Sequence, residues 1–175
     1  HEIVTASNIF SKDAFETFPT FSPDGKTLYF CTAEARPMPQ EYSEVKYNLC
    51  SVSFDPATRA FGTQVDTLYN AKNGGMSASF PRVSPDGRYL LYTLFSYGNF
   101  SIWHKDADLY MADLQAGTSR SLVGVNSDDV ESYHSWSSNS RWFVFSSRRM
   151  DGLYTRPYIA YVGEDGKVGK PFLLP

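Results

Sequence analysis

Three dense runs of apolar residues stand out along the chain, at residues 27–31, 89–94 and 142–145. They do not alternate between apolar and polar side chains, which is typical of strands that are covered on both faces. No long stretch has apolar residues at helical spacing, and Pro and Gly mark tight turns. Aromatic residues, which favour the pleated surface of a sheet, make up 16% of the chain. The pattern therefore predicts an all-β fold.

Each apolar run follows a copy of one motif, which we call the signature. Residues 18–26 read Phe-Pro-Thr-Phe-Ser-Pro-Asp-Gly-Lys, residues 80–88 read Phe-Pro-Arg-Val-Ser-Pro-Asp-Gly-Arg, and residues 133–141 are a degenerate third copy. Pro presets the backbone for a type I turn and Gly supplies the positive φ that closes it, so the motif predicts a hairpin. In the third copy Asn139 tolerates the left-handed region, and we expect the turn to persist.

Two further strands are expected in each repeat. The third strands are predicted at residues 47–54, 108–113 and 157–162, and weaker fourth strands at residues 64–69, 119–123 and 171–174. Four antiparallel strands per repeat are the blade of a β-propeller. We therefore predict a single domain over residues 1–175 with three blades, at residues 18–70, 80–124 and 133–175. Residues 1–17 are interpreted as the lead-in strand of a preceding blade, around Ile3 to Ala6.

The number of predicted blades has a consequence of its own. Propellers close with about four to eight blades, so three form only an arc. Such an arc exposes an apolar sheet face at each end, which favours association. We expect further blades outside this segment, or a second copy of it, to complete the ring.

The signature and the strand after it resemble TolB-like propeller repeats. Residues 136–149, Trp-Ser-Ser-Asn-Ser-Arg-Trp-Phe-Val-Phe-Ser-Ser-Arg-Arg, and residues 98–104, Gly-Asn-Phe-Ser-Ile-Trp-His, look like hallmarks of exported propeller proteins of Bacteroidetes type. The resemblance covers essentially the whole chain. It implies a WD40-like propeller in an exported protein, in the periplasm or at the outer membrane. It specifies the fold and says little about function, because one fold hosts many activities.

Charge and cysteine content narrow the functional classes. The chain has 16 basic and 19 acidic residues, a net charge of -3, which argues against a nucleic-acid partner because that would need a concentrated basic face. No apolar run approaches the ~20 residues that span a bilayer, so no transmembrane segment is expected. Cys31 and Cys50 are too few for a disulfide framework. We expect buried free thiols, with a cross-strand bond as the alternative.

Long connections are predicted together on one rim of the propeller, at residues 32–46, 71–79, 95–107, 124–132 and 148–156. Loops on a rigid scaffold are where binding residues concentrate. The candidate ligand-binding residues in them are Arg36, Tyr42, Tyr97, His104, Asp106, Arg148, Arg149 and Arg156. Their mixed charge suits a polar ligand, such as a glycan or peptide, and a solvated rim is the alternative. Two interpretations stay open for the adjacent arginines Arg148 and Arg149. They bind a carboxylate or phosphate group bidentately, or they form ion pairs with acids of the neighbouring loop.

His134 holds the signature position at which the other copies have Pro. It is expected at the start of an innermost strand, near the central channel. Two interpretations stay open: a contact with a ligand in the channel, or a structural histidine bonded to the backbone. A single imidazole makes no metal site.

Motifs for catalysis are absent from the sequence. There is no G-x-S-x-G or H-E-x-x-H, and the loop acids lack the spacing of a calcium-binding EF-hand. We therefore predict no catalytic residue, metal or cofactor, and a non-enzymatic binding or scaffold module with a protein, peptide or glycan partner on the long-loop face. The alternatives are the propeller part of an enzyme, such as a metal-dependent polysaccharide lyase or a hydrolase accessory domain, and a module for homo-oligomer assembly.

Overall fold

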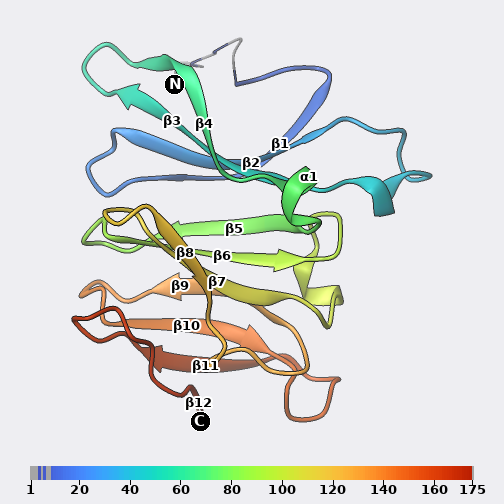
Figure 1. Ribbon diagram of the computed structural model, residues 1–175, viewed down its shortest axis with the longest axis vertical. Coiled ribbons are helices and arrows are strands. Elements are labelled where there is room, and N and C mark those ends of the chain that lie inside the picture. The colour runs from blue at the N-terminus through green and yellow to red at the C-terminus, as the bar shows by residue number, and fades with distance from the viewer. Residues whose placement is uncertain (1–3, 5, 7–8, 175) are drawn as a thin grey trace.

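A computed structural model describes residues 4, 6 and 9–174. Three four-stranded sheets lie one on the next, from blade 1 at the top of Figure 1 to blade 3 at the bottom. The strands of blade 1 are β1 (Ala14–Phe21), β2 (Thr27–Glu34), β3 (Asn48–Asp55) and β4 (Ala60–Tyr69). Those of blade 2 are β5 (Ser77–Val83), β6 (Tyr89–Phe95), β7 (Asp108–Asp113) and β8 (Thr118–Ser121). Those of blade 3 are β9 (Glu131–Trp136), β10 (Trp142–Ser147), β11 (Arg156–Tyr161) and β12 (Phe172–Leu173).

Within each blade the strands are antiparallel and follow chain order, with the signature strand at one edge. The prediction of an all-β fold with three four-stranded antiparallel blades is confirmed. Short helical turns lie only in the connections that the structure describes: η1 (Tyr42–Glu44), α1 (Ala71–Gly74) and η2 (Ser101–Trp103). No helix among the described residues is both long and apolar enough to cross a membrane. Strand β1 already begins at Ala14, before the first signature, while the lead-in strand expected around Ile3 to Ala6 falls largely outside the described residues.

The hairpin turns follow from the chemistry of the signature. In blade 1 the Ser22 hydroxyl donates to Asp24 Oδ1 (2.5 Å), and Lys26 N donates to the same oxygen (3.1 Å). The Gly25 N–H donates to the Ser22 carbonyl (2.9 Å), and the left-handed φ of Gly25, 70°, closes the turn. Blade 2 repeats these contacts. The side chain of Asp therefore holds the turn and Gly lets it close.

The third turn keeps this geometry with different residues. Asn139 takes the role of Asp, because its Oδ1 accepts from the Ser137 hydroxyl (2.7 Å) and from Arg141 N (3.0 Å). The expectation that the turn persists is confirmed, although the left-handed residue is Ser140, with φ 59°, and not Asn139. Ser140 stands where the other copies have Gly. Its Oγ accepts a hydrogen bond from Asp86 N in blade 2 (2.9 Å), a contact that Gly cannot make and that offsets the backbone strain.

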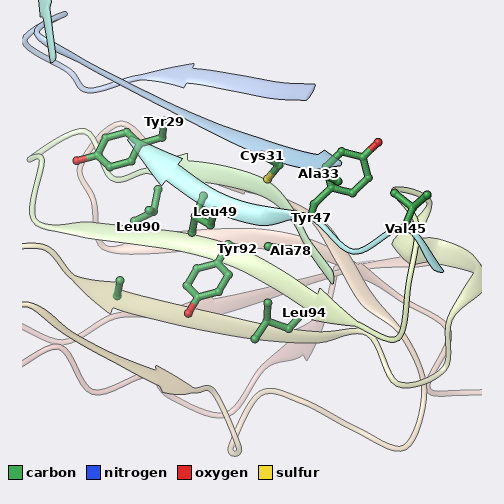
Figure 2. Close-up of a cluster of buried hydrophobic side chains, with 11 residues drawn as sticks. Tyr29, Cys31, Ala33, Val45, Tyr47, Leu49, Ala78, Leu90, Tyr92 and Leu94 are labelled. Carbon is green, nitrogen blue, oxygen red and sulfur yellow. The ribbon is translucent and has the colours of Figure 1, made fainter. Parts of the chain in front are cut away.

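Side chains along the second strand of each blade point alternately to its two faces and so form the hydrophobic cores between blades. Tyr29 and Cys31 face blade 2, where they meet Leu90 and Tyr92 of β6 (Figure 2). The neighbouring residues of β2 point to the opposite face because side chains alternate along a strand. The next core joins blades 2 and 3 and contains Leu91, Leu109, Met111, Phe143 and Phe145. Blade 2 thus buries both faces of its second strand, which explains the unbroken apolar run there, whereas in blade 3 the alternate residues Trp142 and Val144 are only partly buried.

The outward face of blade 1 is covered by the chain itself. Ile9 is buried there against Leu28, Phe30, Cys50 and Val52. Cys50 therefore faces away from Cys31, and both cysteines are buried free thiols, as predicted. Burial raises the pKa of both thiols.

A row of aromatic rings joins the three signature strands. Phe18, Phe80 and Tyr133 open the three copies, and all have left-handed φ values, of 54°, 51° and 51°. Each lies at a register shift in the pairing of its strand. The ring centroids of Phe18 and Phe80 are 4.2 Å apart, and those of Phe80 and Tyr133 are 4.8 Å apart. The same bulge in each blade thus lets the signature strands β1, β5 and β9 contact one another through their aromatic side chains.

Candidate functional site

The connections of the fold divide between two rims. The short turns of the signatures lie on one rim, toward the left of Figure 1, and the long connections lie on the other, toward the right. We call the second the long-loop rim, made of residues 35–47, 70–76, 96–107, 122–130 and 148–155. Large apolar side chains are exposed in these loops: Met38, Phe100, Trp103, Val123, Met150, Leu153 and Tyr154. Trp103 is 73% exposed and Leu153 74%, so this rim offers contact surface to a partner.

Tyr42, Tyr97 and His104 form an aromatic belt across the rim from blade 1 to blade 2. The rings of Tyr42 and Tyr97 meet edge to face at 5.9 Å, and those of Tyr97 and His104 at 4.6 Å. The Tyr42 hydroxyl donates to Asn99 Oδ1 (3.1 Å) and accepts from Asn99 N (3.2 Å). Asp106 lies 3.9 Å from His104 Nδ1. The structure therefore brings together four of the predicted site residues.

Two predicted arginines lie beside the most exposed aromatic rings. The guanidinium of Arg148 is 5.1 Å from the ring centre of Trp103, and Arg148 Nε donates to Thr155 Oγ1 (3.3 Å). Arg156 lies over the ring of Tyr154 at 5.6 Å and pairs with Asp151 at 2.7 Å. The Arg148–Trp103 contact joins the loops of blades 3 and 2. Arginine beside an exposed aromatic ring combines charge with flat apolar surface.

The predicted residue Arg36 lies in another part of the rim, on blade 1. It pairs with Glu34 at 3.2 Å and with Glu41 at 3.6 Å. A hollow of about 410 Å³ beside it is lined mainly by charged side chains. A second hollow, of about 470 Å³, is lined by Phe15, Met38, Tyr42, Tyr47 and Asn99, among others. The rim of blade 1 thus offers two open concavities, one of which is bounded by the aromatic belt.

Arg149 is not available to a ligand in the way that Arg148 is. Its Nη2 donates to Glu131 Oε1 (2.8 Å) and to the Val125 carbonyl (2.8 Å), and its guanidinium lies over the rings of Tyr158 and Phe145. Of the two interpretations of Arg149, an anion site or an ion pair with an acid of the neighbouring loop, the structure shows the ion pair. Glu131, which was not among the predicted site residues, is fully buried beneath the rim.

The Glu131 carboxylate is held by four donors. Oε1 accepts from the hydroxyls of Ser127 (2.6 Å) and Ser147 (2.9 Å) and from Arg149, while Oε2 accepts from Ser127 N (2.9 Å). These bonds tie the connection before β9 to strand β10. Nothing in the sequence distinguishes Glu131 from the neighbouring acids Asp128 and Asp129, because its burial depends on the packing of blade 2 on blade 3.

His134 lies between blades 2 and 3, with 3% of its surface exposed. Burial lowers the pKa of its imidazole to about 4, against the opposing effect of the nearby backbone of Leu91 and Phe80, so the ring is neutral at pH 7. Neither ring nitrogen makes a hydrogen bond of normal geometry to the described residues. The part of the chain that the structure describes contains no group of three or more His, Cys, Asp or Glu side chains placed to hold a metal ion.

Solved structures share this arrangement of sheets. The β-propeller domain of the trilobed protease from Pyrococcus furiosus superposes with a TM-score of 0.52 at 17% identity, covering 94% of this chain and 44% of that chain. This chain is a partial β-propeller. Oligogalacturonate lyase from Vibrio parahaemolyticus gives 0.51 at 16%, covering 90% and 38%, and prolyl oligopeptidase B from Galerina marginata gives 0.56 at 12%, covering 97% and 24%. The chain therefore spans less than half of each of these proteins.

At these identities the similarity shows the fold alone. No protein-family model matches the sequence, and no curated protein is significantly similar to it. The function of this partial propeller therefore has to be inferred from its own residues.

Asp108, at the start of β7, gives the propeller a measurable pH dependence. Burial, followed by the negative charges of Glu131 and Asp106, raises its pKa from 3.8 to about 6. An acid with a raised pKa binds its proton more tightly in the folded state, so Asp108 costs stability above pH 6 and none below the unfolded value. Asp108→Asn removes this partly buried negative charge, and we expect it to stabilise the chain at pH 7.5 by about 1 kcal/mol. The gain is smaller than the full pKa shift would give because solvent screens this partly exposed group.

Urea unfolding of wild type and of Asp108→Asn at pH 7.5 and pH 4 measures this effect. The gain is expected at pH 7.5 and should be only a small fraction of that at pH 4, where the folded wild-type carboxyl is protonated and the pH is close to the unfolded pKa of 3.8. An equal gain at both pH values would show that packing, and not titration, is responsible.

Proposed function

We propose that this partial propeller is a non-enzymatic binding module that holds a protein partner on the long-loop rim. The observation that carries the proposal is the exposure of Trp103, with Arg148 over its ring, and of Leu153 and Tyr154 in the same loop as Arg148; we call these four residues the rim patch. Its members are exposed or half-exposed and come from the loops of two adjacent blades. A rigid stack of sheets below the loops supports them, so little conformational entropy is lost when a partner binds.

The composition of the rim patch favours a protein over a glycan. Tryptophan, tyrosine and arginine are the residue types that most often dominate protein–protein binding energy, and exposed methionine and aromatic side chains are enriched at such interfaces. Leu153, with Met150 nearby in the same loop, adds aliphatic surface that a hydroxylated sugar does not need. Arg148 within the rim patch and Arg156 over the ring of Tyr154 supply positive charge. Sugars stack on aromatic rings as well, so a glycan is the competing outcome.

The cellular setting is part of the same proposal. The resemblance of the signature to TolB-like repeats supports a place in an exported bacterial protein, in the periplasm or at the outer membrane. Similar propeller segments occur within larger proteins, including a protease and a lyase. These neighbours support a scaffold role for the segment, with the binding surface carried by its loops.

Photo-crosslinking tests the proposal. A photoreactive residue at position 153 is expected to yield a discrete crosslinked protein in cells that produce the chain, and one at Ser138, on the opposite rim, is not. Unlabelled wild-type chain should compete, and Trp103→Ala should compete at least tenfold less well, because loss of a hot-spot side chain costs about 2 kcal/mol or more. Phe21→Ala, which removes an exposed ring at the end of β1 that lies on the opposite rim, is the matched control and should compete like wild type.

Two results would contradict the proposal. One is crosslinking of equal yield and identity from positions 153 and 138. The other is retention of a polysaccharide by the chain that depends on Trp103 while no protein is crosslinked, which would assign the rim patch to a glycan. Because Trp103 is exposed, its replacement should leave the urea midpoint unchanged, and this shows that any loss of competition is not caused by unfolding.

A further inference from the structure

The outward face of blade 3 is an apolar sheet surface with no neighbouring blade. Strand β10 turns Phe143 and Phe145 toward blade 2, so the alternate residues Trp142 and Val144 point away from it. In the same way Ile159 and Tyr161 of β11 alternate with buried residues. Trp142 contacts Tyr161 with 4.9 Å between ring centres and Phe172 with 6.4 Å. We call this surface, formed by Trp142, Val144, Ile159, Tyr161 and Phe172, the blade 3 face.

The two interfaces inside the chain repeat one backbone contact. Ala78 N in β5 donates to the Tyr47 carbonyl of blade 1 (2.9 Å), and Glu131 N in β9 donates to the Ala107 carbonyl of blade 2 (2.7 Å). Each donor stands at the same spacing before its signature aromatic residue, and each acceptor immediately precedes the third strand of the earlier blade. This backbone hydrogen bond therefore occurs at both interfaces between blades, and it does not depend on particular side chains.

The register of blade 3 identifies the equivalent acceptor on it. Its third strand, β11, begins at Arg156, so the residue that corresponds to Tyr47 and Ala107 is Thr155. Thr155 is exposed beside the blade 3 face. Its carbonyl is placed to receive an N–H from the signature strand of another blade.

The aromatic row also stops at this end. The ring of Phe80 contacts those of Phe18 and Tyr133, whereas the ring of Tyr133, which is 44% exposed, contacts only that of Phe80 among the aromatic rings of the described residues. Its open flank corresponds to the side on which Phe18 receives Phe80. A further signature strand would bring its own first residue to this position.

The opposite end of the arc does not offer a matching surface. On the outward face of blade 1, Ile9 buries Leu28, Phe30 and Val52. A second copy of the chain would have to displace Ile9 before its blade 1 could dock onto the blade 3 face. Assembly of copies head to tail therefore costs the contacts of Ile9, which favours a different occupant.

We propose that the blade 3 face docks a further four-stranded propeller blade that these 175 residues do not contain. The docking blade places an apolar sheet face over Val144 and Ile159. Its signature strand donates an N–H to the Thr155 carbonyl and stacks its first side chain on Tyr133. This inference rests on the two internal interfaces and is independent of the function proposed for the long-loop rim.

An extended chain tests the docking. Residues 70–124, which contain blade 2 with its connection, are appended after Pro175, because this segment already docks onto blade 1 through Ala78 N and Phe80. Ile159→Lys is then introduced into the original and the extended chain. In the extended chain the lysine would be buried under the added blade, so we expect the ratio of folded to unfolded protein to fall at least about tenfold, against less than about threefold in the original chain.

Ser138→Lys, at an exposed turn position, is the control and should have equal small effects in both chains. Binding of a hydrophobic fluorescent dye should be lower in the extended chain than in the original. A second extension with residues 122–175 covers the case in which the first added blade does not fold. Equal effects of Ile159→Lys in both chains, or undiminished dye binding with both extensions, would overturn the proposal. So would a dimer of the original chain, detected by light scattering, that Ile159→Lys dissociates, since a second copy would then be the occupant.

Discussion

Glu131→Ala is expected to destabilise the propeller by about 3–5 kcal/mol, because removing one partner of a buried ion pair leaves the other without its charge partner. The Glu131 carboxylate is fully buried and accepts hydrogen bonds from Ser127, Ser147 and Arg149. Truncation leaves these donors without their acceptor, and each unsatisfied buried group adds to the cost. The guanidinium of Arg149 keeps the Ser147 hydroxyl, the Val125 carbonyl and the aromatic rings around it, none of which carries a compensating negative charge.

Urea unfolding of Glu131→Ala, Arg149→Met and the double variant measures the effect. Arg149→Met keeps the apolar part of the side chain against Tyr158 and removes the charge. The double variant should lose less stability than the sum of the single losses, because the interaction between the two residues is counted in both. The control is Glu164→Ala, whose carboxylate is 88% exposed in its pair with Arg141 and whose loss should cost no more than about 0.5 kcal/mol. Equal losses for Glu131→Ala and Glu164→Ala would contradict the buried network.

The same network connects the fold to the candidate site. Glu131 ties the connection at residues 122–130 to β10, and Arg148, whose guanidinium lies over Trp103, comes directly after that strand. Loss of the network should therefore loosen the loop that presents the rim patch. Binding to the rim then depends on a residue that makes no contact with a partner, which is why partner binding should be compared among variants of equal stability.

The architecture was predictable because its determinants are local. A Ser-Pro-Asp-Gly turn specifies its own hairpin, since the Asp24 side chain bonds to residues two positions away and Gly25 supplies the required φ. Apolar runs of strand length specify sheets that are covered on both faces. Repetition of these two signals gave the number of blades, their strand order and the rim on which the long loops lie. None of these features requires knowledge of how one blade contacts the next.

The features that were missed all depend on contacts between blades. The turn imposes a left-handed conformation on Ser140 as it does on the equivalent glycines, but the contact of its hydroxyl with Asp86 N in another blade, 54 positions away in sequence, could not be predicted. Ile9 covers the outward face of blade 1, where the pattern alone indicated an exposed surface. Glu131 is buried although loop acids are usually solvated. In each case a distant partner, which the local pattern does not encode, decides the outcome.

The candidate site shows the same division. Tyr42, Tyr97 and His104 meet because propeller topology brings the loops of adjacent blades to one rim, and topology was predictable. The orientations of Arg148 and Arg149 were not, because consecutive side chains diverge. One guanidinium lies over Trp103 at the surface and the other enters the core. Residue type and rim could be assigned from the sequence, whereas accessibility required the packed structure.

Phe143→Ala is expected to cost about 3–5 kcal/mol in the free energy of unfolding, because it leaves a cavity in the core between blades 2 and 3. Phe143 is fully buried on β10 and contacts the rings of Trp136 and Phe145, with centroids 5.6 and 5.9 Å away. The strands around it are held by their ladders, so they cannot collapse into the space that the ring leaves. Phe143→Leu keeps most of the volume and should cost less than about 2 kcal/mol.

The matched control for this core is Phe172→Ala, on the exposed surface of the same blade. It removes an equal side chain from a position that is already in contact with water, and it should cost less than about 1 kcal/mol in the isolated chain. Urea unfolding of the three variants at constant pH gives the comparison. Similar losses for Phe143→Ala and Phe172→Ala would mean that blade 3 does not pack on blade 2 through Phe143. A large loss confined to Phe143 locates the cooperative core of the arc at the interface between blades, because Phe143 is buried in that interface whereas Phe172 lies on the exposed outer strand β12.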